Sequence, residues 1–218
     1  MNAIDVYAGL ADKTISAEEL AKAASTDPGM LQILLDGMEE QKAAVKYGSS
    51  KALRLLCDEA PELLYPHFDL FTEMLQHPNN IFQWQALYVL AGLAGVDEDG
   101  KIEGILNDYF ARIEGPVMVT AANAIKWAAK IVKGQPDLAD QVVAQVLRGE
   151  AGVYESAECN EIVCGAAINT FYRIRKWVSE PEVLYAFAQR HRNSERMPTR
   201  KAAEKFIARY EKDYSLAG

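Results

Sequence analysis

Ala86-Leu87-Tyr88-Val89-Leu90 is one of five copies of a short pattern in this chain. Each copy has an alanine, an aliphatic residue directly after it and an apolar residue three positions further on. The other copies are residues 52–56, 124–128, 167–171 and, in degenerate form, 202–206. Successive copies begin 34, 38, 43 and 35 residues apart. Spacings in this range are typical of tandem helix pairs, so the sequence predicts a repeat protein.

A second amphipathic stretch follows each of the first four copies, after a short segment that contains proline or glycine. These breaking segments are Pro61, residues 95–100, residues 134–136 and residues 179–181. Apolar residues then recur at spacings of three and four, which marks one buried side of a helix. No stretch alternates between apolar and polar residues as a half-buried strand would. We therefore expect an all-α fold with about a dozen helices and no sheet.

A helix pair of this size cannot bury both of its apolar faces alone, so neighbouring pairs must stack. We predict a right-handed α-solenoid, a superhelix of about five helical hairpins that forms a single domain over residues 1–218. Its expected parts are N-terminal capping helices at 1–40, repeats at 41–78, 79–115, 116–150 and 154–192, and a C-terminal capping helix at 196–213.

Two capping boxes are expected at helix starts. In this motif a serine and a glutamate three residues later satisfy each other's backbone N–H groups. Ser16 and Glu19 have this spacing, and so do Ser179 and Glu182.

The composition is that of an ordinary globular protein, with 218 residues, 50% hydrophobic and 25% charged, and a net charge of −8. No apolar run reaches the roughly 18 residues that a membrane-spanning helix needs. The chain does not open with the basic and then apolar segments of a secretory leader. Three cysteines are an odd number, which favours free thiols in a reducing cytoplasm.

Residues 46–56 followed by Pro61-Glu62-Leu63-Leu64-Tyr65-Pro66 look like the helix–proline–helix order of adaptin-like repeats. His77-Pro78-Asn79-Asn80-Ile81 looks like a turn that opens the next repeat. On these residues the chain resembles the HEAT/armadillo superfamily of α-solenoids over roughly residues 28–210. The resemblance implies a scaffold that binds other proteins, although a few such solenoids are enzymes.

No metal or cofactor is expected. The three histidines, His67, His77 and His191, are far apart in the sequence, and no Cys-x-x-Cys pair occurs. Residues 95–103 resemble a calcium loop, but Gly95 and Leu106 stand where the first and last coordinating carboxylates belong. We interpret the acids of this segment as part of a turn at the start of the next helix. No phosphate loop, nucleophile elbow or kinase signature is present, so we predict no catalytic residue.

Charge is unevenly distributed along the chain. Residues 173–213 contain 11 Lys or Arg and 6 Asp or Glu, whereas residues 1–172 contain 12 and 25. On the last predicted helix, Lys201, Lys205, Arg209 and Lys212 share one side. This side is either a polar cap that keeps the last repeat soluble or an anchor for an acidic partner.

The leading hypothesis is a non-catalytic scaffold that binds a protein or peptide along a concave face. Second helices of the pairs tend to line that face in HEAT-like solenoids, so we expect partner contacts at Asp69, Glu73 and Asp108. At the basic end we expect contacts at Lys201, Lys205 and Arg209.

Two alternatives remain open at this level. The first is a nucleic-acid binder similar to the HEAT-like alkylpurine DNA glycosylases, which need a basic concave face. The acidic balance of the chain argues against nucleic acid as a partner. The second alternative is a HEAT-like bilin lyase or a related modifying chaperone.

Overall fold

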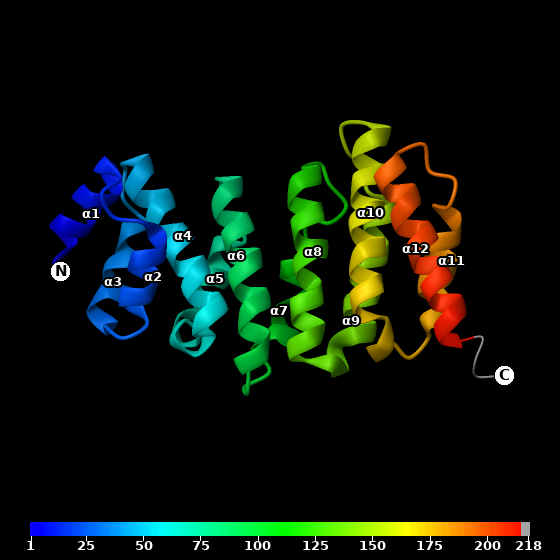
Figure 1. Ribbon diagram of the computed structural model, residues 1–218, viewed down its shortest axis with the longest axis horizontal. Helices are drawn as coiled ribbons and strands as arrows, with labels where there is room; N and C mark the ends of the chain where they lie inside the picture. The colour runs from blue at the N-terminus through cyan, green and yellow to red at the C-terminus, as the bar shows by residue number, and fades with distance from the viewer. Residues whose placement is uncertain (215–218) are drawn as a thin grey trace. The chain divides into compact units, whose positions relative to one another are not determined.

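The computed structural model describes residues 1–214 and contains twelve α-helices and no strand among them (Figure 1). The prediction of an all-helical repeat fold is therefore confirmed. The chain forms two compact units, the first over Met1–Val96 and the second from Asp97 onward. The repeat boundaries given above stay predictions.

The first unit begins with three short helices, followed by the longer α4 and α6 with the seven-residue α5 between them. Its helices are α1 (Ala3–Asp12), α2 (Ala17–Ala24), α3 (Pro28–Gly37), α4 (Ala43–Glu59), α5 (Phe68–Met74) and α6 (Asn80–Leu93). The predicted capping box starts α2, because the Ser16 N–H donates to Glu19 Oε2 at 2.8 Å and the Glu19 N–H donates to Ser16 Oγ at 3.2 Å. This prediction is confirmed.

Helix α4 is the centre of the first unit and packs against α1, α2, α3 and α6. Its Leu53 and Leu56 are fully buried. Gln85 of α6 donates from Nε2 to the carbonyl of Ser50 in α4 at 2.6 Å, so the buried amide satisfies a backbone acceptor between the two helices.

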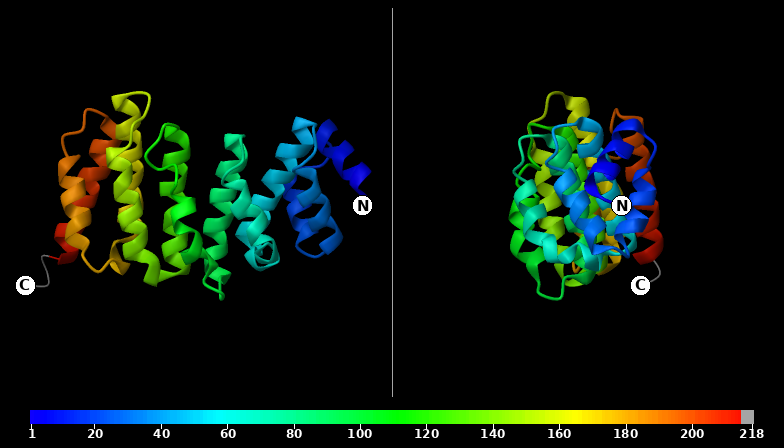
Figure 2. Two further views of the ribbon diagram at one scale, coloured as in Figure 1. Left: turned by 180° about the vertical axis from the view of Figure 1, so that it is seen from behind. Right: turned by 90° about the vertical axis from the view of Figure 1, so that its left-hand side faces the viewer.

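The second unit alternates short and long helices. They are α7 (Lys101–Tyr109), α8 (Met118–Gly134), α9 (Ala139–Arg148), α10 (Ala157–Ile174), α11 (Pro181–Arg190) and α12 (Met197–Tyr214). The long helices α8, α10 and α12 pack side by side and form one layer, which faces the viewer in Figure 1. The short helices α7, α9 and α11 form the layer behind, and from the back α11 comes forward of α12 (Figure 2).

Different contacts hold the two layers of the second unit. In the long-helix layer, Thr170 Oγ1 donates to the carbonyl of Ile125 at 2.9 Å, and Thr199 Oγ1 donates to the carbonyl of Glu161 at 2.7 Å. In the short-helix layer, α9 and α7 are joined by side-chain amides: Gln141 donates to Glu103 at 2.8 Å and Gln145 to Asn107 at 2.9 Å.

The repeat alanines lie where helices pack most closely. Ala52, Ala86, Ala124 and Ala167 are all buried. In the degenerate fifth copy the buried residue is Ala203, while Ala202 is half-exposed. A methyl side chain lets two helix backbones approach, which explains why a small residue returns at this position.

The predicted capping box at Ser179 and Glu182 is wrong. Helix α11 begins one residue later than this motif requires, with Glu180 as N-cap and Pro181 in the first helical turn. Proline has no N–H to satisfy, so it suits that position. The Ser179 N–H instead donates to Asp140 Oδ1 of α9 at 2.9 Å.

The segment that resembles a calcium loop forms a helix start, as predicted. Asp97 Oδ1 accepts from the Lys101 N–H at 2.9 Å, and Oδ2 accepts from the Ile102 N–H at 2.8 Å. Gln135 Nε2 donates to the same Oδ2 at 2.8 Å. The carboxylate therefore holds the first turn of α7 and ties it to the segment after α8.

Candidate functional site

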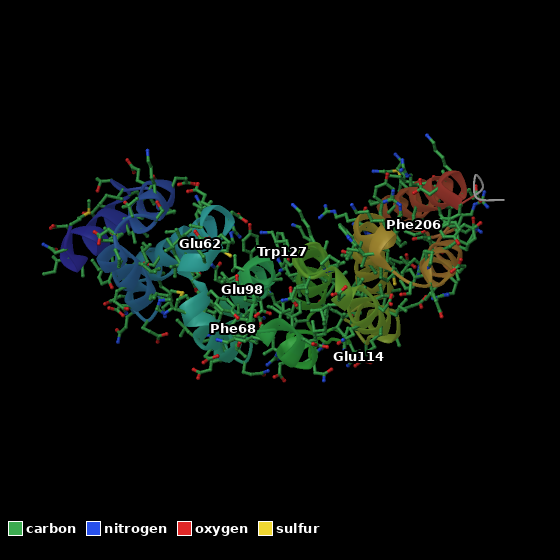
Figure 3. All side chains as sticks on the ribbon, turned by 90° about the horizontal axis from the view of Figure 1, so that it is seen from below. Glu62, Phe68, Glu98, Glu114, Trp127 and Phe206 are labelled. Atoms are coloured by element: carbon green, nitrogen blue, oxygen red, sulfur yellow. The ribbon has the colours of Figure 1, made fainter. Side chains whose placement is uncertain are left out.

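The outward side of α8 is basic. Lys126 and Lys133 are exposed, and residues 118–134 contain no Asp or Glu. The Lys126 ammonium lies 4.2 Å from the centre of the Trp127 ring. Seen from below, Trp127 and Glu114 lie toward opposite edges of the second unit, and nitrogen atoms project from the edge near Trp127 (Figure 3).

The second half of α10 and the 3₁₀ turn that follows it (Arg175–Trp177) are also basic. Arg173 and Lys176 are exposed, and residues 162–176 contain no Asp or Glu. Lys176 stands nine residues after the repeat alanine Ala167, just as Lys133 stands nine residues after Ala124. The repeat alignment gives these two lysines equivalent positions, and we infer that they form one basic row across the layer.

Helix α12 adds the basic residues that the sequence analysis singled out. Lys201 and Lys205 are exposed, and the Lys205 ammonium lies 4.6 Å from the centre of the Tyr172 ring of α10. Arg209 is held by its own helix, because Nε donates to Asp213 at 2.8–2.9 Å. Asp213 also pairs with Arg175 at 3.0 Å. Both arginines lower the pKa of the Asp213 carboxyl, Arg209 most strongly.

The two layers of the second unit differ in charge. The helices α8, α10 and α12, with the 3₁₀ turn Arg175–Trp177, contain 11 Lys or Arg and 5 Asp or Glu. The helices α7, α9 and α11 contain 3 and 4. The long-helix layer is therefore the surface of this unit that favours an anionic partner.

The structure separates the predicted contact residues. Asp69 and Glu73 are exposed and one turn apart on α5, in the first unit. Asp108 is exposed on α7, which belongs to the short-helix layer of the second unit. Lys201, Lys205 and Arg209 lie on α12 in the long-helix layer. The basic members therefore share one helix, Asp69 and Glu73 share another, and Asp108 lies in the other layer from the basic residues.

Sequence analysis missed Lys126, Lys133, Arg173 and Lys176 as members of the same surface. The signal that could have found them was the repeat alignment itself, which places Lys133 and Lys176 at one position. Arg173 and Lys176 fall within the basic segment 173–213, whereas the charge sum over residues 1–172 hid Lys126 and Lys133 among 25 acidic residues.

A second polar cluster joins η5 (Gly149–Ala151), α10 and α11. Arg190 donates from Nε and Nη2 to Glu150 at 3.0 and 2.7 Å, and His191 Nε2 lies 3.1 Å from the same carboxylate. The hydrogen bonds from Arg190 lower the pKa of Glu150 despite its partial burial. Burial raises the pKa of the nearby Cys164 thiol to about 12, so this cysteine is protonated and unreactive at neutral pH. The hydrogen bonds of Glu150 therefore connect η5 to the end of α11.

A shallow pocket of about 640 Å³ opens beside this cluster, near the first turn of α10. Glu158, Glu161 and Glu195 line it together with Arg196. Glu161 is already engaged, because Ser194 Oγ donates to its Oε2 at 2.5 Å. Within residues 1–214, no three His, Cys, Asp or Glu side chains converge so as to hold a metal ion.

His77 has a structural partner, as expected. Its Nδ1 accepts from the Asn79 N–H at 3.0 Å, and its ring meets the edge of Phe82 at 4.7 Å between centres. Across the described part of the chain, no helix combines the length and apolar character needed to cross a bilayer.

No protein-family model and no curated protein matches this chain. Among solved structures it is similar to an engineered protein, with a TM-score of 0.57 and 16% identity over 96% of this chain and 89% of the other. It is also similar to a designed armadillo repeat protein, YIII(Dq)4CqI, with a TM-score of 0.56 and 14% identity over 94% and 92%. At these identities the likeness concerns the fold alone. The fold is an armadillo/HEAT-like helical repeat.

Proposed function

We propose that this protein is a non-catalytic scaffold that binds a segment of another protein on the long-helix layer of its second unit. The observation that carries the proposal is the charge difference between the two layers of that unit. We further propose that it works in the cytoplasm, because the chain has an odd number of cysteines and Cys159 and Cys164 form no disulfide.

The proposed surface differs from the one expected from the sequence. Asp108 and the other second-helix acids were expected to line the partner groove, whereas the basic residues gather on the first helices of the pairs. The acidic residues Asp69, Glu73 and Asp108 therefore have no part in this proposal.

The aromatic rings of this layer favour protein over nucleic acid. Binding of single strands needs ring faces on which bases can stack. The Tyr172 ring instead has Lys205 at 4.6 Å and Arg175 at 4.8 Å from its centre, and the Trp127 ring has Lys126 at 4.2 Å. These cations hold the rings in cation–π contacts.

Site-specific photocrosslinking tests the proposed function. A photoreactive residue at Asn169, which is exposed on α10, should give a discrete protein adduct in extracts of the cells that make this protein. The same residue at Ala144, exposed on α9 in the other layer, is the matched control and should give none. The captured protein, once purified, should bind the unmodified scaffold. Equal labelling from both positions, or turnover of a small molecule by the purified chain, would contradict the proposal.

A further inference from the structure

We propose that the segment bound by this layer is an extended acidic peptide with Asp or Glu at every third position. The inference rests on the proposed function and names its partner class. The surface concerned, called the basic stripe below, is the set of exposed cations on α8, α10 with its following turn, and α12: Lys126, Lys133, Arg173, Lys176, Lys201, Lys205 and Lys212.

The sign of the partner's charge follows from what surrounds the basic stripe. Residues 118–134 and 162–176, which hold four of its seven cations, contain no acidic residue. Glu158 and Glu161 lie near the start of α10, and Glu204 lies next to Lys205 on α12. On α12, Glu211 accepts from Tyr185 at 3.1 Å, and Asp213 is paired with Arg175 and Arg209. Carboxylates of a partner therefore complement the stripe and steer the encounter.

The spacing of the carboxylates follows from the helix packing. Thr170 bonds to Ile125, 45 residues before it, and Thr199 bonds to Glu161, 38 residues before it. These separations are close to the repeat spacings of 43 and 35 residues, so the three long helices lie parallel and nearly in register. Packed helices are about 8–10 Å apart, so cations at equivalent positions recur at about that interval.

An extended peptide that crosses the three helices must present charge at the same interval. A polyproline II chain rises about 3.1 Å per residue and has three residues per turn, so every third side chain points the same way at intervals of about 9 Å. A peptide with acids at i, i+3 and i+6 thus offers one carboxylate to each long helix. The row formed by Lys133 and Lys176 gives two of these contacts, and Lys212, nine residues after the buried Ala203, gives the third.

Three cations of the stripe are held in place before binding. Lys126 lies on the Trp127 ring, Lys176 on the Trp177 ring and Lys205 on the Tyr172 ring. A side chain that is already restrained loses less conformational freedom when a carboxylate arrives. These residues are therefore suited to fix the register of the peptide rather than to add long-range attraction.

Fluorescence anisotropy with defined peptides tests the inference on the full chain. The probe is a labelled fifteen-residue peptide of five Glu-Pro-Pro units, and the composition control has its five glutamates together at one end. We expect the probe to bind about fivefold more tightly than the control, and its affinity to fall about tenfold between low and high salt. A Lys-Pro-Pro peptide should not bind.

A charge-reversal variant locates the binding. Lys133→Glu combined with Lys176→Glu should weaken binding of the Glu-Pro-Pro peptide about tenfold or more. Lys22→Glu combined with Lys42→Glu makes the same change in net charge at exposed positions of the first unit and should leave binding within about twofold. Circular dichroism confirms that both variants are folded before they are compared.

Each remaining outcome overturns the inference. Equal binding of the two glutamate peptides would mean that the surface recognises the charge of the peptide but not the spacing of its carboxylates. Tighter binding of a fifteen-nucleotide single strand would assign the surface to nucleic acid, and an unaffected Lys133/Lys176 variant would place the site elsewhere. If the Asn169 crosslink still captures a protein in any of these cases, the proposed function stands and only its acidic specificity fails. Absence of both the crosslink and peptide binding would overturn both.

Discussion

Asp97 is a single residue on which the start of α7 depends. Its carboxylate accepts two backbone N–H groups and the amide of Gln135 while it is itself buried. We predict that Asp97→Ala lowers the free energy of unfolding by about 1–2 kcal/mol, the usual cost of removing a helix cap. Urea denaturation measures this as a lower midpoint at constant slope. Glu98→Ala, one residue on, should change it by less than about 0.5 kcal/mol, and equal effects of the two would contradict the capping role.

Glu150 makes stability depend on pH. Arg190 lowers the pKa of Glu150 in the folded state, so the folded chain holds the charged carboxylate more readily than the unfolded chain does. The stabilisation is therefore present at neutral pH and is lost as the pH falls through the lowered pKa. We predict that Glu150→Gln is less stable than the unmodified protein at pH 7 and that the difference shrinks toward about pH 3. Urea midpoints across this range test the prediction. Glu155→Gln, at an exposed carboxylate, is the control. If the stability difference between Glu150→Gln and the unmodified protein grew as the pH fell, the prediction would be refuted.

At the scale of elements, α10 and α12 approach each other at Gly165. A Cβ built at Gly165 would lie 2.7 Å from Thr199 Oγ1, and that hydroxyl already donates to the carbonyl of Glu161. Overpacking costs about 1–3 kcal/mol, whereas replacing glycine in a helix gains at most about 1 kcal/mol. We therefore predict that Gly165→Leu destabilises the protein.

The matched control for this contact is Gly104→Leu in α7. Nothing lies within 4 Å of a Cβ built at Gly104, so only the gain in helix propensity remains and the variant should be slightly stabilised. Thermal unfolding followed by circular dichroism distinguishes the two. A Gly165→Leu variant that melts above the unmodified protein would show that α10 and α12 are not closely packed there.

At the scale of the whole molecule, each unit has its own core. Repeat arrays are stabilised by contacts between neighbours, and the second unit has three long helices packed in succession. We predict that residues 97–218, produced alone, keep a helical circular dichroism spectrum and unfold cooperatively, although below the melting temperature of the full chain. A spectrum of random coil would contradict this prediction, provided that the full chain is helical under the same conditions.

Much of the fold could be predicted from the sequence, because the patterns that specify helices and their ends are local. The buried alanines Ala86 and Ala124 mark close helix packing, and the capping box at Ser16 and Glu19 appears as predicted. The prediction failed at Ser179, because the helix starts one residue later, with Glu180 as N-cap and Pro181 in the first turn. The charge of each helix can be counted from the sequence, whereas the packing of the three long helices into one layer is seen only in the structure.

Apolar periodicity, small residues at a fixed interval and helix-breaking residues were enough to specify helices and their repetition, because hydrophobic burial and backbone hydrogen bonding act over one or two turns. The grouping of Lys126, Lys133, Arg173 and Lys176 arises from packing. A surface charge acts together with whatever lies within about 10 Å in space, and the nearest equivalents of these residues are about forty positions away in the chain. Stacking put cations of separate repeats on one layer and Asp108 on the other.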